Sequence, residues 1–149
     1  MLFRSGLDKS EKEGLIESMR RGMQDALLMG VMAGSLSEGY DYEGNLLKGV
    51  VIVGLPFAQP TLEVESLIQF YEKKFGAGLG RPYAYVHPTF HKVLQAAGRM
   101  IRSPDDRGVV VLLDKRFGWG SYRASYPRDF APKPSQDVAA DVARFWTKR

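Results

Sequence analysis

The chain has 149 residues, of which 44% are hydrophobic and 26% charged, a balance typical of one globular domain with a single core. It has no cysteine, which excludes disulfides, iron–sulfur clusters and thiolate zinc sites from this chain. The net charge of +4 comes from residues 99–149, which hold 11 Lys and Arg against 6 Asp and Glu, and this excess favours a polyanionic partner.

The apolar runs are too short to span a membrane, and the N-terminus lacks the apolar core of a signal peptide. We therefore expect a cytoplasmic protein without a membrane partner. His87 and His91 are the two histidines, and Pro88 between them indicates a helix start rather than a metal site, so we expect no metal ligands.

The first half of the chain predicts a helix followed by two buried strands. Ser10 and Glu13 have the spacing of a capping box, which predicts a helix over 10–21 that ends at Gly22. Two apolar runs, 26–36 and 49–57, are typical of strands buried on both faces.

The second half predicts three helices and one strand. A helix follows the N-cap residue Thr61 and stops at the glycines after Phe75, and another contains Gln95. The run 107–114 is a buried strand, and Ser135 is expected to cap a last helix with core positions Val138, Val142, Phe145 and Trp146. Alternating strands and helices predict an α/β fold, an open sheet of mainly parallel strands.

Ligands of such sheets bind at the carboxyl ends of the strands, which directs attention to the loops after residues 36, 57 and 114. The first loop, "GSLSEGYDYEG" (34–44), combines glycines with acids, and Gly39 and Asp41 are its candidate ligand contacts. A solvated acidic turn is the alternative. No Walker A, GxSxG or HExxH pattern is present, which disfavours a self-contained hydrolase.

The segment "HKVLQAAGRMIRSPDDRG" (91–108) reads as an amphipathic helix that turns into the next strand. Gln95, Arg99 and Arg102 fall on one face, and the opposite face carries apolar side chains, namely Val93, Leu94, Ala97, Met100 and Ile101. Taken alone, the polar face is best explained by contact with water.

These segments in this order resemble the second RecA-like motor domain of superfamily 2 DNA helicases, in the iron–sulfur XPD/DinG group associated with DNA repair. "GSLSEGYDYEG" with "VVIVGLPFAQP" resembles motif V, "QAAGRMIRSPDDRG" resembles motif VI, and "LLDKRFGWGSYRASYP" resembles the segment after it. The resemblance spans about residues 26–127 and implies a three-layer RecA-like open sheet with helices on both faces.

The resemblance implies roles for the residues of motif VI. Arg99 and Arg102 would be arginine fingers on the γ-phosphate, with Gln95 near the phosphate or the attacking water and Gly98 allowing close approach. A planar, permanently charged guanidinium suits the charge that develops on phosphoryl oxygens.

The resemblance also implies roles for motif V and for the segment after motif VI. Motif V would couple the nucleotide sugar to the DNA groove, through Glu38, Gly39 and Asp41. The segment after motif VI mixes cations with aromatic rings, a combination that binds single-stranded DNA, through Arg116, Trp119, Tyr122 and Arg123. An aromatic surface packed on a neighbouring domain is the alternative for that segment, and Phe57 is expected in the core.

The family's first motor domain has no counterpart here. We therefore expect residues 1–149 to form one N-terminally incomplete motor domain, with 128–149 as a basic segment and helix. ATP would be shared with a first motor domain, which would hold the Mg²⁺ and the 4Fe–4S cluster, and the chain would be inactive alone. A non-catalytic module that binds nucleic acid or protein is the alternative, and the oligomeric state stays open.

Overall fold

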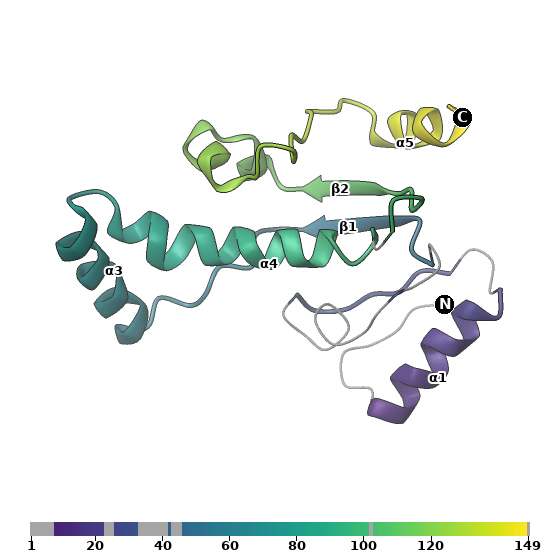
Figure 1. Cartoon of the computed structure of the whole chain (residues 1–149), viewed down its shortest axis with the longest axis horizontal. Helices are drawn as coiled ribbons and strands as arrows, with labels where there is room; N and C mark the ends of the chain where they lie inside the picture. Colours follow the sequence, from purple (N-terminus) through teal and green to yellow (C-terminus); the bar gives the residue numbers. More distant parts are fainter. Residues whose placement is uncertain (1–7, 23–25, 33–41, 43–45, 102, 149) are drawn as a thin grey trace.

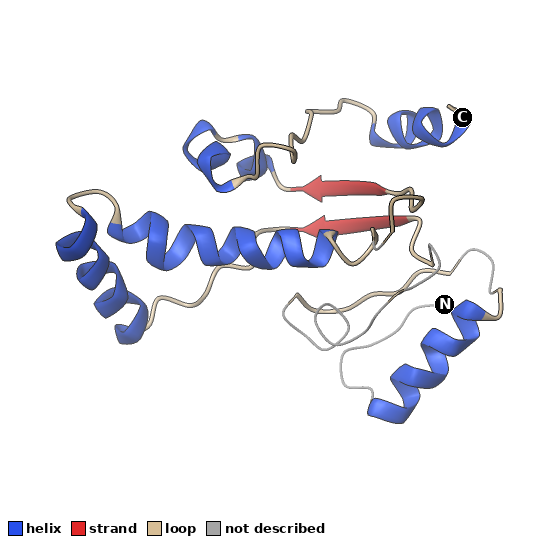
Figure 2. Cartoon of the chain, viewed as in Figure 1, coloured by secondary structure: helices blue, strands red, loops and turns tan. Residues whose placement is uncertain are grey.

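The computed structural model describes residues 8–22, 26–32, 42, 46–101 and 103–148 (Figures 1 and 2). Its elements in chain order are α1 (Lys9–Arg20), β1 (Gly49–Val53), α3 (Leu62–Phe75), the π-helical turn η1 (Pro82–Val86), α4 (His87–Ala97), β2 (Val109–Leu113), the 3₁₀ turns η2 (Lys115–Gly118) and η3 (Gly120–Ser125), and α5 (Val138–Thr147).

Helix α1 begins at a capping box, but not at the one that the sequence predicts. The Asp8 carboxylate accepts the Glu11 amide at 2.8 Å, and the Glu11 carboxylate accepts the Asp8 amide at 2.8 Å. The pair Ser10 and Glu13 was therefore the wrong choice, because the helix is already formed at Lys9. Its predicted end is confirmed, since Gly22 follows with a φ of 93°.

Strands β1 and β2 pair in parallel, with Val50 beside Val110 and Ile52 beside Leu112. Both lie inside the predicted runs 49–57 and 107–114. Strand β1 stops four residues earlier than predicted, because Gly54 takes a φ of 77°, which few other residues adopt.

The run 26–36 was predicted as a strand, and residues 26–32 are not one. Leu27, Met29 and Val31 are exposed, and the described ladder joins only β1 to β2. An apolar run becomes a strand only where a neighbour supplies backbone partners, which this part of the chain lacks among the described residues. Residues 33–36 lie outside them.

Helix α3 has the predicted cap and end, since the Thr61 hydroxyl accepts the Val64 amide and Gly76 follows Phe75 with a φ of 109°. The next helix is longer than predicted. Helical backbone runs from Gly80 through η1 into α4, so Pro88 lies within it rather than at its start.

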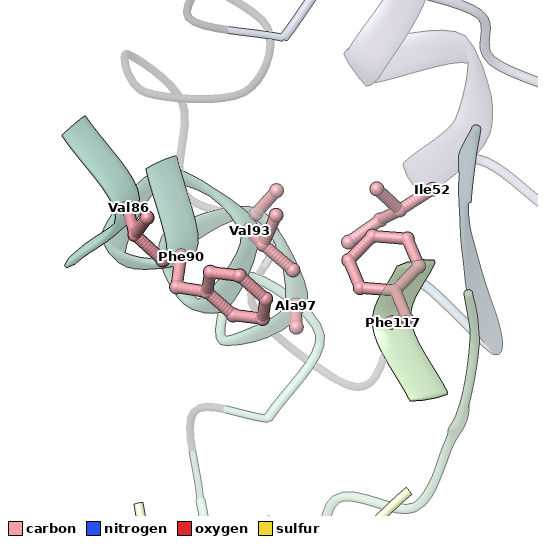
Figure 3. Packing of buried hydrophobic residues seen from close by; sticks show 7 residues of the cluster. Ile52, Val86, Phe90, Val93, Ala97 and Phe117 are labelled. Atoms are coloured by element: carbon pink, nitrogen blue, oxygen red, sulfur yellow. The ribbon is translucent and has the colours of Figure 1, made fainter. Parts of the chain in front are cut away.

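The core lies between α4 and one face of the sheet. Figure 3 shows Val86, Phe90, Val93 and Ala97 of the helix facing Ile52 of β1 and Phe117 of η2. Phe90 is 1% exposed, and its ring meets three aromatic neighbours edge-on, namely Phe117, Tyr122 and Tyr126.

Helix α5 lies over the other face, where Val142 and Trp146 approach Val51, Val109 and Val111. Its cap is Asp137, which accepts the Ala140 amide, and not the predicted Ser135, whose hydroxyl donates to Asp141 instead. The predicted core positions are only half-buried, or exposed at Val138 and Trp146.

Arg107 contacts the C-terminal end of α5. Its guanidinium donates to the carbonyls of Phe145 and Lys148 and lies over the rings of Phe145 and Trp146. The described strands are thus parallel, with α4 on one face and α5 on the other, which confirms an α/β fold. Over the described residues, no helix is long and apolar enough to cross a membrane.

Candidate functional site

The residues predicted from motif VI gather where α4 ends. Gln95 is exposed in the last turn of the helix, and Arg99 is half-buried two residues after Ala97. The Arg99 amide donates to Ala96 O, and the Met100 amide donates to Ala97 O. Gln95 and Arg99 are therefore held on one short stretch of regular backbone.

The predicted helix through residue 102 is too long, since α4 ends at Ala97. Val93, Ala97 and Met100 are buried as predicted, whereas Ile101 is 46% exposed. Met100 explains the early end, because its side chain fills the space where a Cβ on Gly108 would lie. The chain must turn back there, and the Ser103 amide closes that turn on the Asp106 carboxylate at 2.8 Å.

Gly98 has an ordinary helical φ of −68°. A Cβ added there would contact only the carbonyl oxygens of Leu94 and Gln95, at 3.2 and 3.8 Å, which belong to the preceding turn of the same helix. Close packing of another element on Gly98 is not seen among the described residues, and its predicted role of letting the helix approach a nucleotide stays a prediction.

Four further predicted site residues lie outside the part of the chain that the structure describes, namely Glu38, Gly39, Asp41 and Arg102. Their assignments stay predictions from the sequence.

Arg116 is held by Asp114 at the carboxyl end of β2. The guanidinium makes a bidentate ion pair with the carboxylate, with Nη2 to Oδ2 at 2.6 Å and Nε to Oδ1 at 3.0 Å. The same carboxylate accepts the Arg116 amide and so starts η2. These hydrogen bonds lower the pKa of Asp114 to about 2 and raise that of Arg116.

The substitution Asp114→Asn should lower the melting temperature by about 1–3 °C at neutral pH, because a part-exposed ion pair is lost. The pKa of Asp114 lies below its ordinary 3.8, so its stabilisation is complete above that pH and is lost as the pH falls through about 2. Thermal melts over that range should show the two proteins converging. A constant difference would contradict the assignment, and Asp129→Asn, on an exposed turn, is the control.

Aromatic rings line the same end of the sheet. Trp119 is 45% exposed and lies 5.8 Å from Tyr122, whose ring lies 6.1 Å from that of Phe57. Phe57 stacks on Tyr85 at 4.8 Å and 9°, and we call these four residues the aromatic strip. Phe57 was expected in the core but is half-buried in this strip. Tyr85 was not among the candidate site residues predicted from the sequence.

Arg116 lies beside the aromatic strip, and Arg123 follows Tyr122 along the chain. The Arg116 guanidinium lies 5.7 Å from the centre of the Phe57 ring, and Arg123 of η3 is exposed. The structure thus brings Arg116, Trp119 and Tyr122 close to one another. Their contact with single-stranded DNA, like that of Arg123, stays a prediction from the sequence.

The structure does not bring Gln95 and Arg99 to the aromatic strip. In Figure 1 the arrowheads of β1 and β2 point toward η2 and η3, whereas α4 runs the opposite way. The end of α4 therefore lies near the amino ends of the strands, about 20 Å from Tyr85 at 1.5 Å per helical residue. The site consists of two separate surfaces.

The described part of the two surfaces does not offer the ligand set of a metal centre. Among the described residues, no three His, Asp or Glu side chains are grouped to hold a metal ion. His87 instead shares a hydrogen bond of 3.1 Å with the Ser125 hydroxyl and meets the Tyr83 ring edge-on.

Comparison with curated proteins finds DNA helicases. The chain is 42% identical to the ATP-dependent DNA helicase DinG of Photobacterium profundum over 85 residues, 56% of this chain and 12% of that protein. It is 29% identical to the ATP-dependent DNA helicase chl1 of Neosartorya fischeri, over 97% of this chain and 20% of that protein. The chain therefore spans a fifth or less of either relative.

Solved structures give the same result. The structure titled "XPD_Helicase" matches 84% of this chain with a TM-score of 0.62 and 27% identity, and covers 22% of that chain. The one titled "XPD_APO" matches with a TM-score of 0.63 and 26% identity. These matches confirm the RecA-like fold class. The family model described as "Helicase C-terminal domain" matches residues 1–133, and the chain belongs to this family of C-terminal domains of XPD/DinG-type superfamily 2 helicases.

Proposed function

We propose that this chain is the second motor domain of an ATP-dependent DNA helicase that moves on single-stranded DNA. The observation that carries the proposal is the end of α4, where an exposed Gln95 precedes a half-buried Arg99 in a segment that the helicase family model matches. The relatives named as ATP-dependent DNA helicases support the same reaction.

In this proposal the end of α4 faces a nucleotide held by a first motor domain, the partner of this chain. Arg99 and Arg102 donate to the γ-phosphate oxygens as negative charge develops on them, and Gln95 orients the phosphate or the attacking water. Both guanidiniums and the Gln95 amide N–H donate to phosphate oxygens, which fits contact with the phosphates of ATP. ATP supplies the transferred phosphoryl group.

The other cofactors of the family do not fit these residues. A 4Fe–4S cluster needs cysteine thiolates, and the chain has none. Mg²⁺ needs grouped oxygen ligands, and the described residues offer no such group. We therefore assign both to the first motor domain and derive no step through them.

The second surface is proposed to contact single-stranded DNA. Trp119 offers an exposed ring for base stacking and Tyr122 lies beside it, while Arg116 and the exposed Arg123 of the same segment are proposed to contact the phosphates. From motif V, Glu38, Gly39 and Asp41 are proposed to link the nucleotide to this path.

Reconstitution tests the proposed function. Adding this chain to a first motor domain and single-stranded DNA should raise the rate of ATP hydrolysis by about 10³-fold or more, because arginines supplied across an interface contribute that much. Phosphate release is measured with the first motor domain alone as the control. An unchanged rate would contradict the proposal and would favour the non-catalytic binding module.

A further inference from the structure

Arg81 stands beside the aromatic strip and belongs to none of the motifs that the sequence singles out. Its guanidinium carbon lies 4.9 Å from the centre of the Tyr85 ring, one helical turn further along. Arg81 is exposed and lies at the start of the helix that leads into η1. The strip thus ends on a cation at the side opposite to Trp119.

The Tyr85 ring beneath Arg81 is fixed from two directions. Its hydroxyl donates to the carbonyl of Ala58 at 3.0 Å, and its face stacks on Phe57 at 4.8 Å. A cation over a fixed ring loses little freedom when it binds a ligand, so the guanidinium is preorganised.

The charge of Arg81 is available, in contrast to that of Arg116. Arg116 is neutralised by its bidentate pair with Asp114. The structure gives Arg81 no carboxylate partner among the residues it describes, and the Tyr85 ring is its recorded contact. Of these two arginines, Arg81 is therefore the one whose charge a phosphate at the strip would meet uncompensated.

The backbone at this point has an uncommon geometry. Residues Pro82–Val86 form a π-helical turn, closed by the His87 amide on the Pro82 carbonyl. Such turns are rare overall but are frequent at functional sites. Here the turn directs Tyr83 toward Phe75 of α3, at 4.7 Å, and Tyr85 toward Phe57.

We propose that Arg81 contacts the phosphate backbone of single-stranded DNA and that the DNA path runs from Trp119 across Tyr122, Phe57 and Tyr85 to this residue. The inference rests on the proposed function and adds a binding residue and a direction to it. Arg81 anchors the strand by charge, and the exposed parts of the rings offer stacking surfaces between the two ends.

The test is the salt dependence of binding. The full chain is titrated with a fluorescein-labelled oligothymidylate at a series of salt concentrations, and anisotropy gives the association constant. Each phosphate contact that is lost lowers the slope of log K against log salt by about 0.7 for a single strand. We expect Arg81→Gln to lower the slope by that amount, and Arg81→Lys to restore it because the charge returns.

The matched control is Arg21→Gln, which removes the same charge next to α1, at the other end of the molecule from η1 (Figure 1). It should leave the slope unchanged. If Arg81 only packs on Tyr85, Arg81→Gln changes the melting temperature without changing the slope, and the inference is overturned while the proposed function stands. If the wild-type chain shows no salt-dependent binding, both the inference and the single-strand part of the proposed function are overturned.

Discussion

Replacing Arg99 or Arg102 by alanine is expected to lower DNA-stimulated ATP hydrolysis by about 10³-fold or more in the motor assembled with a first motor domain, while ATP still binds. As the proposed arginine fingers, these residues would stabilise charge that appears only in the transition state, so their loss should lower kcat and leave nucleotide affinity nearly unchanged. Arg99→Lys should not restore the rate, because an ammonium lacks the planar fork of a guanidinium.

Phosphate release and equilibrium binding of a fluorescent ATP analogue separate these two quantities. The matched control is Arg144→Ala on α5, whose guanidinium is already paired with Asp141. Wild-type turnover in both variants would contradict the finger assignment. Weakened ATP binding with an unchanged kcat would instead indicate that these arginines hold the ground state.

The largest expected change in stability follows from Phe90→Ala. The side chain is 1% exposed and fills the space between α4 and Phe117, so its removal leaves a cavity that the surrounding rings cannot close. The free energy of unfolding should fall by about 3–5 kcal/mol, a large part of what a domain of this size has.

Urea unfolding followed by far-ultraviolet circular dichroism measures that loss. Phe75→Ala removes a ring of the same size from a position that is 42% exposed, and it should cost about 1 kcal/mol or less. Equal losses in the two variants would show that α4 is not the centre of the core.

The sequence predicts the elements whose signals are local. Helix α3 is bounded by its own residues, with Thr61 at one end and Gly76 at the other, and the runs that contain β1 and β2 are rich in branched apolar side chains. The sequence does not decide between Ser135 and Asp137 as the N-cap of α5, since both residue types cap helices well. In the structure Asp137 is the cap and accepts the Ala140 amide.

Tertiary contacts decide the features that the sequence did not predict. The apolar spacing of α4 continues to Ile101, but the helix stops earlier because Met100 packs over Gly108. Tyr85 contacts Phe57 and Ala58, which lie far from it along the chain on the other side of α3, and Arg81 in turn lies over the Tyr85 ring. No helical or strand periodicity encodes such a contact.

Helix α4 runs between the two proposed contact surfaces and packs against the sheet on the way. Phe90, Val93 and Ala97 pack in one buried cluster with Ile52 of β1 and Phe117 of η2, and such a close-packed contact transmits a displacement. A rotation imposed on Gln95 and Arg99 by nucleotide hydrolysis would therefore be passed to the aromatic strip. The mechanical step on DNA would then be set by how far the whole domain turns, and not by the bending of any loop within it.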